Sequence, residues 1–147
     1  MNIWLCTSDS RTHMDLAYQK GGLWGARSGK MLDKWWREIS KGDLALFYLG
    51  QPISGLVGAG KIERKPSRDE IEPVWPDETP NRIIYPNRFS FKILHPKSNR
   101  PVWESHKIPI YHEIDGIRGL LGYGFKPVRD KHIQSKLINR VRDSDWV

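Results

Sequence analysis

The chain has 147 residues, of which 38% are hydrophobic and 11% aromatic, which suits one folded domain and excludes a disordered chain. Its net charge of +7 favours a polyanionic partner such as nucleic acid. One cysteine excludes an intrachain disulfide and a cysteine-based zinc site. Without a signal peptide or a membrane-length apolar run, the chain is expected to be cytoplasmic and to stay out of membranes.

The N-terminal part predicts two helices between short extended segments. The order is a buried strand, a helix, a short strand or loop, and a second helix, over residues 1–7, 11–20, 23–30 and 31–40. Ser8 or Asp9 can cap the first helix, and Gly21 ends it. The second helix carries apolar residues at the i, i+3, i+4, i+7 spacing.

The remainder predicts a hairpin, a long loop, a strand and a C-terminal helix. These elements cover residues 44–50 with 53–65, 66–81, 88–95 and about 128–142, with one short strand near Ile108. Strands dominate the middle and helices flank it, without a repeat or a linker. We therefore expect one mixed α/β (α+β) domain over residues 1–147, with a bent, mostly antiparallel, barrel-like sheet and peripheral helices.

The sequence contains no convincing catalytic, metal or cofactor motif. GLVGAGKI (residues 55–62) matches seven positions of the phosphate-binding loop pattern, but Ile62 replaces the hydroxyl that holds Mg²⁺, and no helix is predicted after it. The five histidines are scattered, without the spacing of a metal site. Cys6 lies in an apolar strand, where a cysteine usually acts as a small hydrophobic residue. We therefore predict no metal, no cofactor and no catalytic residue.

Two tryptophans lie in segments that follow neither a helix nor a strand period. Trp24 lies in GGLWGA and Trp75 in EPVWPDETP, where glycine and proline dominate. An aromatic side chain in such a segment is a candidate platform for a nucleobase, and the alternative of a loop tryptophan packed over the core edge fits the pattern equally well.

The order of several short segments resembles the EVE domain, a PUA-like domain related to YTH domains. The resemblance covers roughly residues 2–128 and is carried by IWLCTS, LWGA, KGDLALFYLG, ISGLVGAGKIE, VWPDETP and RFSFKIL. It implies a PUA-like β-barrel flanked by helices, with a pocket for a modified base of DNA or RNA, such as N6-methyladenine or 5-methylcytosine. It also implies a non-catalytic reader, which we expect to be a monomer.

The resemblance assigns the pocket residue by residue. The implied aromatic walls are Trp24, Trp75 and Tyr85, and the implied polar contacts to the base are Thr7, Ser8, Thr12, Tyr48 and the main chain of Gly25. Cations close to these walls in the sequence are candidates for flanking phosphates, namely Arg27, Lys30, Arg82 and Arg88.

Two other function classes remain open from the sequence. One is an enzyme similar to ASCH domains, which share the PUA-like barrel and act in some cases on nucleic acid or small amides. Lys41, Asp43 and Glu63 are the available acid–base residues for such an enzyme, although their spacing matches no known signature. The other class is a protein-interaction module that uses the tryptophans as a binding hot spot.

Overall fold

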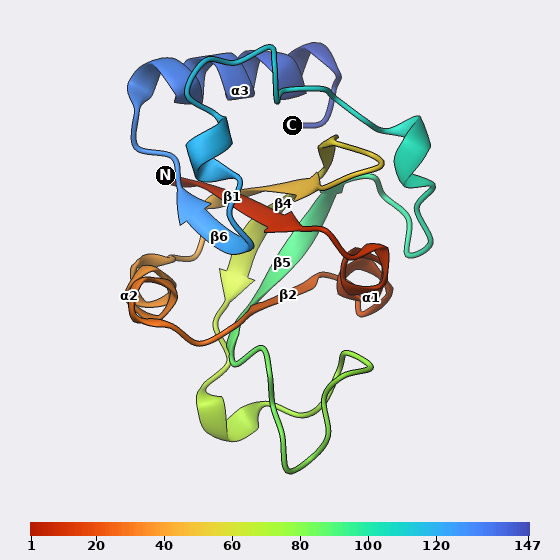
Figure 1. Cartoon of the computed structure of the whole chain (residues 1–147), viewed down its shortest axis with the longest axis vertical. Coiled ribbons are helices and arrows are strands. Elements are labelled where there is room, and N and C mark those ends of the chain that lie inside the picture. Colours follow the sequence, from red (N-terminus) through yellow and green to blue (C-terminus); the bar gives the residue numbers. More distant parts are fainter.

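The computed structural model describes all residues from 1 to 147 and contains one six-stranded sheet and three α-helices (Figure 1). The strands are β1 (Ile3–Ser8), β2 (Leu23–Ala26), β3 (Leu44–Leu49), β4 (Gly55–Arg64), β5 (Asn87–His95) and β6 (Gly124–Pro127). The helices are α1 (Arg11–Gln19), α2 (Lys30–Glu38) and α3 (Lys131–Asp143). Short 3₁₀ turns occupy Arg68–Glu70, Trp103–Ser105 and Arg118–Leu120.

The sheet bends into a nearly closed barrel. Its strand order is β2-β5-β4-β3-β1-β6, and every neighbouring pair is antiparallel except β1 and β3. The two edge strands approach each other, and the indole Nε1 of Trp24 in β2 donates to the carbonyl oxygen of Gly124 in β6 at 3.0 Å. This bond ties the two edges together, and the predicted PUA-like barrel with flanking helices is confirmed.

The two faces of the sheet carry separate hydrophobic clusters. In β1, Trp4 and Cys6 belong to the inner cluster, whereas Leu5 belongs to the outer one. The outer cluster includes Leu137 and Val141 of α3, which lies along that side of the barrel (Figure 1). Because both faces are covered, β1 is buried along its whole length, which explains its uninterrupted apolar sequence.

The structure corrects several details of the sequence prediction. Ser10, and not Ser8 or Asp9, caps α1, since its hydroxyl accepts from the backbone N–H of His13. The C-terminal helix begins at Lys131, after Asp130 as the cap. Strand β6 was not predicted, and Ile108 forms an isolated bridge to Leu56 in place of a strand. No helix combines the length and the apolar character that a membrane span requires.

Trp24 was assigned to a segment without a regular period, and that assignment was wrong. It lies in β2, is 0% exposed, and packs at 5.2 Å from the ring of Phe47 in the inner core. Trp24 is therefore first a core residue that closes the barrel, and its role at a binding site depends on what lies beside it.

Candidate functional site

Four rings from distant parts of the chain meet beside the open edge of the barrel. The imidazole of His13, in α1, stacks on Trp75 with ring centres 4.5 Å apart and planes 11° apart. It also meets Trp24 and Tyr85 edge-on, at 5.0 and 4.7 Å between ring centres. His13 thus fills the space among the three aromatic residues that the sequence assigned as walls of a base pocket.

The protonation state of His13 follows from its partners. Its Nε2 lies 2.9 Å from the carbonyl oxygen of Gly25, and because a carbonyl only accepts, Nε2 carries the proton. Burial lowers the pKa of His13 to about 4, so the ring is neutral at pH 7. The other ring nitrogen, Nδ1, has no protein partner and is not sealed from solvent. His13 therefore presents a fixed hydrogen-bond acceptor.

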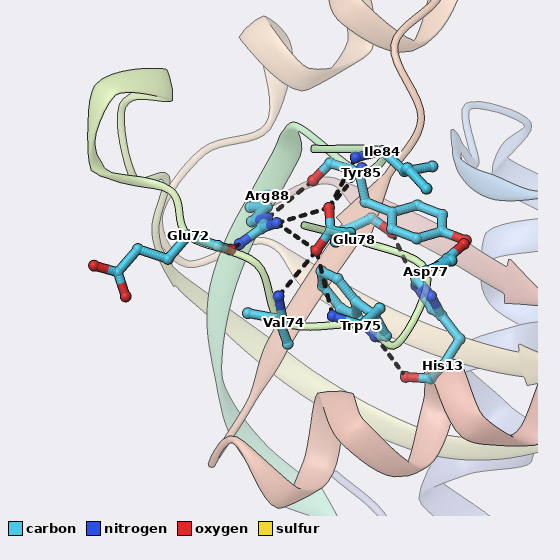
Figure 2. Close-up of polar contacts among 10 residues, drawn as sticks. His13, Glu72, Val74, Trp75, Asp77, Glu78, Ile84, Tyr85 and Arg88 are labelled. Carbon is cyan, nitrogen blue, oxygen red and sulfur yellow. Dashed lines mark hydrogen bonds and ion pairs between the residues drawn. The ribbon is translucent and has the colours of Figure 1, made fainter. Parts of the chain in front are cut away.

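The loop between β4 and β5 is organised around the buried carboxylate of Glu78 (Figure 2). The guanidinium Nη2 of Arg88 donates to its two oxygens at 2.9 and 3.0 Å. Four backbone N–H groups donate to the same carboxylate, those of Val74, Trp75, Ile84 and Tyr85. Burial alone raises the pKa of Glu78, but these backbone bonds outweigh burial and hold the pKa below its ordinary value.

Two predicted site residues are engaged within this loop. The guanidinium of Arg88 also donates to the carbonyl oxygens of Tyr85 and Glu72, and Arg88 is only 2% exposed. Its assignment to a phosphate is wrong, because the guanidinium is buried and each of its three nitrogens already donates to a protein acceptor. Trp75 is also 2% exposed, with His13 stacked on its ring and the Arg88 guanidinium carbon 5.1 Å from its centre. Trp75 therefore offers no free face to a base.

A cavity of about 300 Å³ opens beside the ring cluster, between the edge strands β2 and β6. It gathers most of the residues that the sequence assigned to the pocket, namely Thr7, Ser8, Trp24, Gly25, Tyr85 and the cation Arg27. Sequence reasoning missed His13, Asp9, Leu32 and Tyr123, which also line it. Tyr123 stands between Gly122 and Gly124, which is the same aromatic-between-glycines signal that singled out Trp24.

The remaining predicted residues lie elsewhere. Thr12 and Trp75 line an adjoining cavity of about 270 Å³, which shares Ser10, His13 and Tyr85 with the first, and Tyr48 lines a third of about 700 Å³. Lys30 and Arg82 are exposed and line none of these cavities. The structure therefore divides the predicted pocket among three neighbouring hollows.

Gly25 has a packing role that differs from the one expected. A Cβ atom at this position would lie 2.6 Å from the ring of Trp75, so only glycine lets the indole lie against β2. The Gly25 carbonyl is already bonded to His13. The glycine therefore admits a tryptophan side chain, whereas the sequence reasoning assigned the space to an approaching base.

Of the three residues that the sequence offered for an enzyme, Asp43 is engaged within the fold. The carboxylate of Asp43 is buried and accepts from the indole of Trp4 and from the backbone N–H groups of Asn2 and Ser40. Lys41 and Glu63 are exposed. No group of three His, Cys, Asp or Glu side chains is placed to hold a metal ion.

Comparison with known proteins identifies relatives of the whole fold. The family model of the EVE domain matches residues 2–135. Among curated proteins, none matches this sequence. A hypothetical protein from Leishmania major superposes with a TM-score of 0.58 at 19% identity, over 98% of this chain and 97% of that chain.

Two further solved structures share the fold. The Mmi1 YTH domain in complex with RNA has a TM-score of 0.56 at 14% identity, over 97% of this chain and 80% of that chain. A mutant ASCH protein from Zymomonas mobilis has a TM-score of 0.53 at 9% identity, over 95% of this chain and 98% of that chain. At these identities the likeness concerns the fold alone.

The buried, neutral state of His13 predicts a specific pH dependence of stability. The pKa of His13 is about 4 in the folded protein and about 6.5 in the unfolded chain, so the unfolded chain binds the proton first as the pH falls. The contribution of His13 to the free energy of unfolding is fully present above pH 6.5 and is lost as the pH falls towards 4. Between pH 7.5 and 5.0 this contribution falls by about 2 kcal/mol. In His13→Phe, which has no titrating ring at this position, the free energy of unfolding should lack this part of the pH dependence.

Urea unfolding at the two pH values measures this contribution. His95, whose pKa burial also lowers to about 4, contributes equally in both proteins. The exposed His132 provides the matched control, and His132→Phe keeps the wild-type dependence. An unchanged pH dependence in His13→Phe would show that His13 is not buried in its neutral form.

Replacing Glu78 by Gln should destabilise the fold strongly. A glutamine amide turns a donor towards backbone N–H groups that need an acceptor, and it leaves the Arg88 guanidinium buried without its counter-charge. Breaking a buried pair of this kind costs about 3–5 kcal/mol in the free energy of unfolding, which chemical denaturation measures.

Glu70→Gln is the matched control in the same loop. Its carboxylate pairs with Arg64 on the surface, where solvent screens the pair, so the change should lower the free energy of unfolding far less than Glu78→Gln does. Equal costs for the two variants would contradict the role assigned to Glu78.

Proposed function

Because the chain belongs to the EVE domain family, whose model matches residues 2–135, we propose that it binds nucleic acid and holds one modified base in the cavity beside His13. The shared fold with a YTH domain that was solved with RNA supports a nucleic-acid ligand. The net charge of +7 supports the same class of partner.

The observation that carries the proposal is the chemistry of the cavity of about 300 Å³. Its lining includes His13, Trp24, Tyr85 and Leu32; Trp24 is fully buried, so the half-buried Tyr85 and Leu32 are the apolar surfaces that suit the flat face of a base and an added methyl group. The neutral His13 offers Nδ1 as an acceptor, and an exocyclic amino group of adenine or cytosine is a matching donor. N6-methyladenine and 5-methylcytosine both keep such an N–H group.

Polar groups at the rim complete the recognition of a base. Ser8 is the last residue of β1 and Asp9 follows it, and both line the cavity. Arg27 is exposed at the rim, with its guanidinium carbon 5.4 Å from the centre of the Tyr85 ring. In this proposal Arg27 holds a flanking phosphate, and the exposed Lys30 and Arg82 add charge without reading the base.

A base must leave its stack to enter this cavity. A duplex base has to flip out, which costs a few kcal/mol, whereas an unpaired base enters more readily. Stacking against an aromatic side chain returns about 1–3 kcal/mol per base, and the bond to His13 adds to it. The proposed protein is a reader, since the cavity supplies stacking and hydrogen bonds and no chemical step is assigned to it.

An enzyme acting on nucleic acid or a modified nucleoside is the second candidate, favoured by the fold shared with an ASCH protein. The engagement of Asp43 in three hydrogen bonds argues against the acid–base set that the sequence offered. Incubation with RNA or with acetylated cytidine distinguishes the two functions, because an enzyme releases product and a reader returns the ligand unchanged.

Two substitutions test the reader directly. Tyr85→Ala removes a half-buried wall of the cavity, and His13→Phe keeps an aromatic ring while removing the acceptor. Each should weaken binding of the preferred modified oligonucleotide roughly tenfold or more, with a smaller effect on the plain one. Fluorescence anisotropy with oligonucleotides carrying N6-methyladenine, 5-methylcytosine or 5-hydroxymethylcytosine, in single- and double-stranded form, measures the difference.

Thr12→Ala is the matched control, since Thr12 is exposed and lines only the neighbouring cavity. Circular dichroism confirms that each variant is folded. Retention of full discrimination by both Tyr85→Ala and His13→Phe would place the base elsewhere.

A further inference from the structure

A second and larger cavity adjoins the one assigned to the base. It has a volume of about 700 Å³, and it shares Thr7, Asp9 and Tyr123 with the smaller cavity of about 300 Å³. The shared residues lie at the end of β1 and just before β6, which are neighbouring strands. A nucleic-acid strand with one base in the first cavity can therefore place its next nucleotide in the second cavity, across this boundary.

An unsatisfied hydroxyl points to a ligand in the second cavity. Thr7 is 3% exposed, and its Oγ1 is the one buried side-chain oxygen or nitrogen without a hydrogen-bond partner. In β1, Thr7 lies on the same face as Leu5 of the outer cluster, and it pairs with Tyr48 of β3. Tyr48 lines only the second cavity, so the Thr7 side chain lies on the side of the sheet that faces that cavity. A buried polar group without a partner is costly, and a ligand would satisfy it.

Aromatic side chains surround the same space. Tyr111 is 40% exposed and Tyr123 is 68% exposed, although tyrosine rings are usually covered, and both line the second cavity. An exposed ring at the border of a polar cavity is suited to stack on a base. Lys107 is the lysine on its lining and is exposed, so it can meet a phosphate.

The carboxylates of Asp9 and Glu113 also line this cavity. They repel phosphate but accept hydrogen bonds from the amino groups of bases and from sugar hydroxyls. The cavity therefore suits a base with its sugar, whereas a free phosphate or a nucleotide triphosphate meets unfavourable charge. The phosphate of a nucleotide bound in this cavity fits on the side where Lys107 lies.

We propose that the second cavity binds the nucleotide next to the modified base, so that the preferred ligand is a single strand of at least two nucleotides. This inference rests on the proposed function, because the first nucleotide enters the cavity beside His13. The two bases are then separated by the Thr7–Tyr123 boundary and cannot remain stacked on each other. In a duplex with one flipped base the neighbouring base stays paired, and the second cavity stays unused.

Isothermal titration calorimetry with matched ligands tests this inference. The probes are the nucleosides N6-methyladenosine and 5-methylcytidine, the corresponding dinucleotides with one plain neighbour on either side, and a duplex carrying the same modified base. For at least one modification, a dinucleotide should bind about tenfold or more tightly than its nucleoside, and a single strand more tightly than the duplex.

Variants test whether the higher affinity of the dinucleotide comes from the second cavity. Lys107→Ala and Tyr111→Ala, at residues that line only the second cavity, should each reduce the advantage of the dinucleotide severalfold while leaving nucleoside binding unchanged. Thr7→Val, at the boundary of the two cavities, should reduce dinucleotide binding more than nucleoside binding. Thr7→Val should not lower the thermal midpoint of the free protein, because it removes an unsatisfied hydroxyl and keeps the side-chain shape. Lys97→Ala, an exposed lysine outside both cavities, is the control and should keep the full advantage.

The outcomes separate this inference from the function on which it rests. Nucleoside binding without any dinucleotide advantage, or an advantage that all three variants retain, overturns the second subsite and leaves the reader intact. Equal affinity for the single strand and the duplex also overturns it. Absence of binding by every ligand overturns both proposals.

Discussion

The buried ion pair between Glu78 and Arg88 is the interaction on which the candidate site depends. The loop between β4 and β5 contains one short 3₁₀ turn and one isolated bridge between Thr79 and Arg82, which leaves most of its backbone outside any ladder. The Glu78 carboxylate supplies the missing acceptor for four backbone N–H groups, and Arg88 neutralises it from β5 (Figure 2). Trp75 and Tyr85 are thereby fixed to the barrel, and they in turn fix the ring of His13.

Because of these contacts, the candidate binding site does not lie among the aromatic rings that the sequence singled out. The rings of Trp24, Trp75 and Tyr85 surround an imidazole that belongs to the protein. The space among them is already filled, and the open volume lies beside it, towards the end of β1. His13, which had no assigned role from the sequence, becomes a wall with a defined acceptor, because burial keeps its ring neutral and the bond to the Gly25 carbonyl fixes its tautomer.

Sequence patterns predicted the parts of the fold that depend on local or periodic signals. The apolar run of β1, the helical spacing of α2 and the glycine-separated hairpin of β3 and β4 all appear in the structure. Strand β6 escaped notice because it is short and contains Gly124 and Pro127, which usually end strands. The site was harder to predict because its contacts are long-range. Nothing near Trp75 in the sequence indicates that His13 and Arg88 cover its ring, and nothing near Arg88 indicates that Glu78 neutralises it.

The central claim is that a modified base lies beside His13, in the cavity that Trp24, Tyr85 and Leu32 line. A crystal structure of the protein with a single-stranded oligonucleotide that carries the preferred modified base tests it most directly. The account predicts the modified base in that cavity, with a base N–H group within hydrogen-bond distance of His13 Nδ1 and the His13–Gly25 bond intact. A base stacked on Trp75 after displacement of His13, or a base bound away from this edge of the barrel, would contradict it.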